Sequence, residues 1–251
     1  MLKRIAVVGA SEKSAASLMA KQECQGLLLA ALGAKEKVQA GTVAAVGEPR
    51  HIEAVLNAAR AIGEEHEGIL NLLACAIDCR EGITPGASER VRDHAARFAR
   101  ALNLSPDDQL LLERGALLRD VGKIKVPNEV LLKHGVLTYD EWLLLQAHST
   151  LGAELLREQG VCPDVLEIVH YHHECYDGDG YPDHLEKEAI PYFARIMKIV
   201  DVYCAMTSPR HYRAHQSSHK DALLFLNSER GKHFDPQLID VFVASEVGQS
   251  T

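Results

Sequence analysis

Apolar residues recur at three- and four-residue spacing along most of this chain, and this helical period constrains the fold more than any other feature. The pattern begins near Pro49 and continues almost to the end of the 251 residues. Within Ser88–Leu104, for example, one face carries Val91, Ala95 and Phe98. Apolar stripes of this kind must be buried against other helices. The sequence therefore predicts an all-α domain from Pro49 onward.

Two helix starts carry specific signals. Ser105 is a typical N-cap, and Pro106 follows it at the first helical position. Thr138 and Glu141 form a capping box, which we expect to open one long helix that reaches about Gln159. Further helices are expected at residues 52–62, 69–77, 109–118, 163–172, 191–205, 220–227 and 236–245.

The first 48 residues have a different pattern. Leu2–Val8 and Val38–Val46 are typical of short strands, and Ala15–Leu32 has the composition of a helix. We expect residues 1–48 to form a small α/β or helical accessory segment, and residues 49–251 to form the main domain.

The bulk composition excludes several classes of protein. The hydrophobic fraction of 47% is that of a globular protein, and the net charge of −8 argues against a surface that coats DNA or RNA. No apolar stretch approaches the roughly 20 residues of a membrane span, and the first residues do not resemble a signal peptide. These features favour a cytoplasmic protein without a membrane span. A nucleotide ligand stays compatible with them, because a few local basic residues are enough to bind two phosphates.

A pair of adjacent histidines, His172 and His173, is the strongest sign of chemistry. Imidazole nitrogens are suited to ions such as iron, manganese and zinc. The pair is followed by Asp177–Pro182, a glycine-rich run with the composition of a tight turn. Core packing has no obvious need for two adjacent histidines before such a turn, so the motif indicates a metal site.

Other polar residues lie at or inside apolar helical patterns. Asp120 follows the helix 109–118, His148 lies within a predicted helix, and Asp201 interrupts an apolar run. A carboxylate in such a run either binds something or is costly to bury. Each residue alone has an ordinary structural explanation, as a core histidine or a buried capping acid.

Taken together, these residues and the loop Asp177–Pro182 resemble the HD-GYP domains, which are bacterial metal-dependent phosphodiesterases that act on cyclic di-GMP. The resemblance extends from about Pro49 to about Val243 and implies an HD-GYP-type helical bundle. It implies metal ligands at Asp120, His148, His172, His173 and Asp201. It also implies catalytic roles for Asp120 and Lys123, and contacts with the nucleotide from Lys123, Tyr181, Arg210 and Arg213.

The chain departs from the family pattern at three positions. Ala87 and Arg119 stand where the family has metal-binding histidines, and Cys204 stands where members often have aspartate. Arg119 brings a permanent positive charge, so we expect it to pair with Asp120 or Asp201. His94 is a possible substitute ligand, although it is out of register with Ala87. The resemblance therefore implies at most one divalent ion, iron or manganese, with no ion as the alternative.

Two main hypotheses for function follow. The first is a degenerate HD-GYP domain that has lost hydrolysis and acts in cyclic di-GMP signalling, by binding this or a related nucleotide or by binding a protein partner through the loop Asp177–Pro182. The second is an active cyclic di-GMP phosphodiesterase with a reduced metal site. A third class is a purely structural domain that binds neither metal nor nucleotide.

Overall fold

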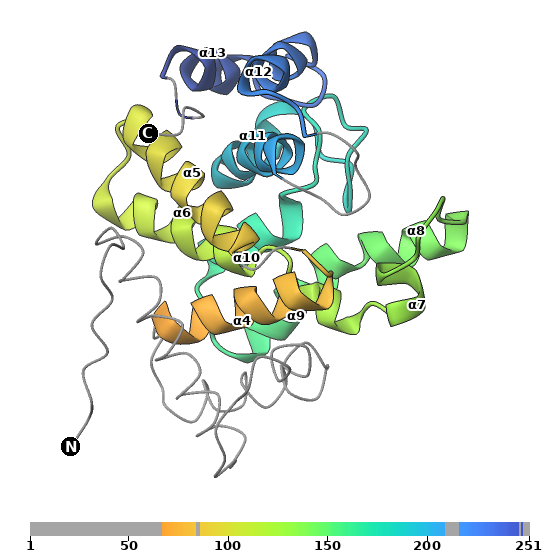
Figure 1. The fold of residues 1–251 in the computed structure, drawn as a ribbon. Coiled ribbons are helices and arrows are strands. Elements are labelled where there is room, and N and C mark those ends of the chain that lie inside the picture. Colours follow the sequence, from red (N-terminus) through yellow and green to blue (C-terminus); the bar gives the residue numbers. More distant parts are fainter. Residues whose placement is uncertain (1–66, 84–85, 209–215, 246, 248–251) are drawn as a thin grey trace, which may run out of the picture.

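The described part of the protein is a bundle of helices (Figure 1). A computed structural model of the chain describes residues 67–83, 86–208, 216–245 and 247. Between these residues there are only isolated β-bridges, Asp177 with Glu186 and Arg230 with Phe234, and no β-strand. The predicted all-α fold is therefore confirmed. The accessory segment expected at 1–48 and the helix expected at 52–62 lie outside the described residues.

The described elements follow one another along the chain with short connections. In order they are α4 (Glu67–Arg80), α5 (Ala87–Ala101), α6 (Pro106–Leu118), the 3₁₀-helix η2 (Val121–Lys125), α7 (Asn128–Leu131), α8 (Tyr139–Gln146), α9 (His148–Glu158), α10 (Pro163–Tyr171), the 3₁₀-helix η3 (Lys187–Ala189), α11 (Tyr192–Thr207), α12 (His219–Ser228) and α13 (Pro236–Ala244). None of the described helices is long and apolar enough to cross a membrane.

The core consists of two clusters of buried apolar side chains. One cluster joins α4, η2 and α9, and the other joins α5, α11, α12 and α13. Helices α6 and α10 contribute to both clusters, and they approach closely because Gly115 leaves room for the side chain of Ile168. Figure 1 shows this arrangement, with α11–α13 on one side and α4 with α9 on the other. The two clusters therefore share a central pair of helices.

The predicted helix starts are confirmed. The hydroxyl of Ser105 accepts a hydrogen bond from the backbone N–H of Asp108, and Thr138 and Glu141 form the complete capping box. Both signals are local, because each depends only on residues within one turn of the helix.

The single helix predicted from Thr138 to about Gln159 is wrong, because the chain turns at Ala147 and forms α8 and α9 instead. The side chains of His148 and Ser149 bind the carbonyl oxygens of Leu145 and Gln146. In a continuous helix those oxygens would accept from backbone N–H groups four residues further on. His148 therefore lies at the first position of α9 rather than in mid-helix.

Candidate metal centre

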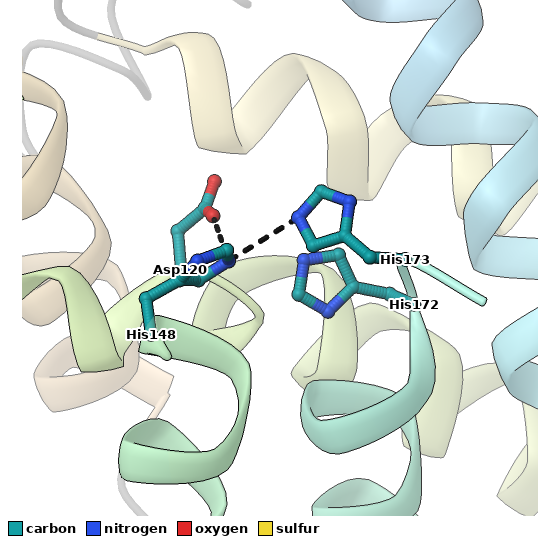
Figure 2. A group of neighbouring side chains, drawn as sticks. All are labelled: Asp120, His148, His172 and His173. Atoms are coloured by element: carbon teal, nitrogen blue, oxygen red, sulfur yellow. Dashed lines mark hydrogen bonds and ion pairs between the residues drawn. The ribbon is translucent and has the colours of Figure 1, made fainter. Parts of the chain in front are cut away.

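Four side chains from three parts of the chain converge at one point (Figure 2). They are Asp120, His148, His172 and His173, and each offers one ligand atom within 4.8 Å of the others. The Nε2 atoms of His148 and His173 are 3.2 Å apart, and Nε2 of His148 is 3.5 Å from Oδ1 of Asp120. Among the described residues this is the group whose geometry could hold a metal ion. The predicted convergence of these four residues is confirmed.

Close backbone contact between η2 and α9 brings Asp120 next to His148. A Cβ on Gly122 would lie 1.9 Å from the carbonyl oxygen of His148 and 2.5 Å from the backbone nitrogen of Gly152. Only glycine at position 122 allows this approach, because both neighbouring atoms belong to the backbone and cannot rotate away. Asp120, at the start of η2, is thus held beside the first residue of α9.

Backbone carbonyls orient two of the three imidazoles. Nδ1 of His148 donates to the carbonyl oxygen of Leu145 at 2.6 Å, and Nδ1 of His172 donates to that of Val169 at 2.8 Å. A carbonyl can only accept, so Nδ1 carries the proton in each neutral ring and Nε2 keeps its lone pair. Figure 2 shows these rings turned toward the centre of the group. A backbone partner of this kind is typical for a metal-binding histidine.

Burial keeps the three imidazoles neutral. It lowers the pKa of His148 to about 3, and it is the largest cause of the lowered pKa values of His172 and His173. For Asp120, burial alone would raise the pKa, but Lys123 and Arg119 outweigh it and bring the pKa well below its usual value. Three neutral imidazoles and one carboxylate are thus available, the donor set that iron, manganese and zinc accept.

The residues present fit a divalent metal ion. Nε2 of His172 is buried and has no hydrogen-bond partner within the described structure, and such an orphaned atom is costly unless something binds it. The 3.2 Å between the Nε2 atoms of His148 and His173 also suits shared ligation, since two donors about 2.0–2.1 Å from a tetrahedral ion are about 3.3 Å apart. The group can therefore hold one ion.

Asp201, the fifth expected ligand, is engaged elsewhere. Its Oδ1 accepts a hydrogen bond of 2.7 Å from Nε of Arg119, and it lies outside the group of four. The same guanidinium reaches Asp120, with Nη2 3.1 Å from Oδ2. The expectation that Arg119 pairs with Asp120 or Asp201 is confirmed, and it pairs with both. Burial lowers the pKa of Arg119, but the two carboxylates outweigh this and raise it.

Lys123 supplies a second fixed cation. Its Nζ lies 2.9 Å from Oδ1 of Asp120 and 2.7 Å from Oε1 of Glu81. Burial lowers the pKa of Lys123, but the two carboxylates raise it by more than burial lowers it. The side chain therefore stays protonated. Glu81 was not identified from the sequence. Its only signal is an acid at the end of an apolar helix, which also fits a residue in contact with solvent.

A cavity of about 220 Å³ lies beside the four-residue group. Its walls include His173 and both cations, and also the two positions where the chain departs from the family pattern with small side chains. The lining residues that bear on the site are Ala87, Arg119, Lys123, His173, Asp201 and Cys204. The cavity gives a ligand access to the candidate metal centre.

The glycine-rich loop covers one side of the group. The ring of Tyr181 stacks on that of His173, with centroids 4.7 Å apart and planes 22° apart. A Cβ on Gly180 would lie 2.2 Å from the backbone nitrogen of Cys175. The backbone at Gly180 therefore packs directly against the backbone at Cys175, just before the loop. The buried carboxylate of Glu174 accepts from the backbone N–H of Asp183 at 2.7 Å. These contacts hold Tyr181 against the metal-binding group.

Of the remaining candidates, only His94 can be placed, and it lies outside the group. Nδ1 of His94 donates to the carbonyl oxygen of Arg90 at 2.8 Å, within its own helix, and its ring packs near Tyr203. It is not part of the metal group, so a role as substitute ligand has no support. Arg210 and Arg213 lie outside the described residues.

Known proteins are similar in sequence to this region. A family model described as "HD domain" matches residues 71–238. The chain is 41% identical over 173 residues to the cyclic di-GMP phosphodiesterase response regulator RpfG of Xanthomonas campestris, covering 68% of this chain and 46% of the relative. It is 31% identical over 173 residues to 3'3'-cGAMP-specific phosphodiesterase 2 of Vibrio cholerae, covering 68% of this chain and 33% of that protein. The chain thus spans less than half the length of these curated relatives.

A solved structure shares the fold. Bd1817, an HDG"Y"P protein from Bdellovibrio bacteriovorus, superposes with a TM-score of 0.56 at 14% sequence identity, covering 93% of this chain and 80% of that one. At this identity the likeness concerns the fold alone. The match of the family model over residues 71–238 shows that the chain belongs to the HD domain family.

Proposed function

We propose that this chain is a metal-dependent phosphodiesterase that hydrolyses a cyclic dinucleotide, cyclic di-GMP or 3'3'-cGAMP, with a single divalent ion, iron or manganese. The observation that carries the proposal is the group Asp120, His148, His172 and His173, which has the donor set and the spacing for one ion. The relatives named above act on these two nucleotides and support the substrate class. They favour the active enzyme, the second hypothesis from the sequence, over the degenerate domain.

The side chains around the cavity have distinct proposed roles. Asp120 and the three histidines would hold the ion, and a bound divalent ion supplies Lewis-acid activation of water and of the phosphate group. Water would add to phosphorus while one bridging P–O bond breaks, and the leaving oxygen takes up a proton. Lys123, which stays protonated, would hold the negative charge of the phosphate in the cavity. It would act as a fixed charge and not as a base.

We also propose that Tyr181, Arg210 and Arg213 contact the rest of the nucleotide. Tyr181 lies over His173 at the edge of the group and offers an aromatic ring near the cavity. Arg210 and Arg213 are proposed on the sequence alone, since arginine suits bidentate contact with phosphate.

A second candidate function is binding of the nucleotide without hydrolysis. Two observations favour it: Ala87 offers no ligand at the cavity wall, and Arg119 neutralises Asp201. Such a protein would signal through a partner, with the exposed part of the loop Asp177–Pro182 as the proposed contact.

One experiment separates the two functions. The protein is purified without oxygen, its iron and manganese are measured, and cyclic di-GMP and 3'3'-cGAMP are incubated with it and resolved by chromatography. If the protein is an enzyme, linear dinucleotide should form in proportion to the bound metal. A His148→Ala/His172→Ala variant should then form at least about hundredfold less product. Nucleotide binding measured by calorimetry, with no product at full metal occupancy, would instead establish the binding protein.

A further inference from the structure

Arg119 is a buried cation that joins two carboxylates beside the candidate metal centre. Its side chain is only 8% exposed, and three of its nitrogens have partners. Nε donates to Asp201 at 2.7 Å, Nη2 lies 3.1 Å from Asp120, and Nη1 donates to the backbone carbonyl oxygen of Ala116 at 2.7 Å. The backbone contact anchors the guanidinium, so its position does not depend on the two acids alone.

The two oxygens of Asp120 consequently face different partners. Oδ2 faces Arg119, whereas Oδ1 faces Lys123 at 2.9 Å and Nε2 of His148 at 3.5 Å. A carboxylate bridges two metal ions by giving one oxygen to each. With Oδ2 committed to the guanidinium, Asp120 has one oxygen for one ion, on the side of the histidines.

One oxygen of Asp201 is also held by Arg119. Its Oδ1 accepts a charge-assisted hydrogen bond of 2.7 Å from Nε of Arg119. Breaking such a buried pair to free the carboxylate would leave the Arg119 charge without this partner, which is strongly unfavourable. Asp201 therefore stays with Arg119 when an ion occupies the neighbouring group.

From these contacts we propose that Arg119 acts as a built-in cation that limits the centre to one metal ion, by occupying the space between Asp201 and Asp120 and pairing with one oxygen of each. Arg119 is a positioning residue in this role, and it never needs to touch the substrate. The proposal rests on the proposed function only in requiring that the four-residue group binds metal.

The test counts bound Mn²⁺ per chain by calorimetry and by electron paramagnetic resonance, independently of activity. The wild type should bind one ion. Arg119→Gln, which removes the charge and keeps a similar size, should release both carboxylates and bind a second ion at least tenfold more tightly than any second ion in the wild type. Arg119→Lys keeps the positive charge and should still bind one.

Two variants of Asp201 complete the design. Arg119→Gln/Asp201→Asn lacks the freed carboxylate and should return to one ion. Asp201→Asn alone should bind one ion with affinity within about threefold of the wild type, and it decides the case if Arg119→Gln does not fold. A wild type with two ions, an Arg119→Gln protein with one, or a tenfold loss of affinity in Asp201→Asn would each overturn the proposal. A wild type that binds no metal would instead overturn the proposed function.

Discussion

The imidazole rings divide their two nitrogens between structure and ligation. In His148 and His172, Nδ1 is held by a backbone carbonyl one turn earlier, and Nε2 faces the centre. His94 has the same Nδ1 contact with its own helix, yet its ring packs near Tyr203 and away from the group. The same local hydrogen bond therefore occurs in a candidate ligand and in a histidine outside the candidate centre.

These two histidines provide a matched pair of variants. His148→Asn removes one of four ligands and should weaken Mn²⁺ binding about hundredfold or more, since even changes to residues that only support a ligand cost 10–100-fold. His94→Asn should leave Mn²⁺ affinity within about threefold of the wild type. Calorimetric titration of the metal-free proteins measures both. Equal affinity in His148→Asn and the wild type would remove His148 from the centre.

The centre depends on how η2 packs against α9, because these elements contribute Asp120 and His148. Gly122 and Gly152 face each other at this contact: a Cβ on Gly122 would collide with backbone, and a Cβ on Gly152 would lie only 3.0 Å from the backbone nitrogen of Gly122. The break at Ala147 serves the same arrangement, since it places His148 at the start of α9. The ligand positions are thus set by two backbone segments in contact.

Gly122→Ala should force η2 and α9 apart. Overpacking of this kind costs about 1–3 kcal/mol or more, and the separation of Asp120 from His148 should also lower metal affinity at least tenfold. Gly160→Ala is the control: Gly160 has open space around it and only a positive φ of 78°, so it should lose about 1 kcal/mol and keep metal affinity. Urea unfolding and Mn²⁺ titration measure the two effects. A Gly122→Ala protein with unchanged metal affinity would contradict this account of the contact.

Across the molecule, the site draws on elements from both apolar clusters. Asp120 follows α6 and His172 follows α10, the two helices that the clusters share, whereas Asp201 lies on α11 in one cluster only. Without metal, the buried imidazoles keep at least one unpartnered nitrogen. An ion would therefore link α9, η2 and the end of α10 and satisfy that atom.

Metal should stabilise the whole domain against heat. An ion that binds only the folded state at about 100 times its Kd adds about 2.7 kcal/mol, which raises Tm by several degrees in a domain of this size. Thermal unfolding with Mn²⁺ and with a chelator measures the difference. The His148→Asn protein should show little of this shift, and an equal shift in both proteins would mean that the ion binds elsewhere.

Much of the fold follows from local patterns. The helical period predicted the all-α domain, and the caps at Ser105 and Thr138 marked where α6 and α8 begin, because each signal acts within one helical turn. The candidate ligands Asp120, His148, His172 and His173 were also predicted from the sequence, because together with the loop Asp177–Pro182 they resemble the HD-GYP pattern, and the four side chains do lie together. The turn at Ala147 was missed, because the apolar period continues on both sides of it. The helix is interrupted by side-chain hydrogen bonds of His148 and Ser149 to backbone carbonyls, which the period does not reveal.

The sequence by itself determined the class of fold and the residue types of the candidate metal centre. Only the tertiary structure decided how the charges pair. Arg119 and Asp201 are 82 residues apart, and Lys123 and Glu81 are 42 apart, so no local rule connects them. Packing of α11 against α6 and of α4 against η2 brings each acid next to a buried cation, and the cost of leaving buried charges unpaired then fixes the pairing. For this reason Asp201, a metal ligand by resemblance, became the partner of Arg119.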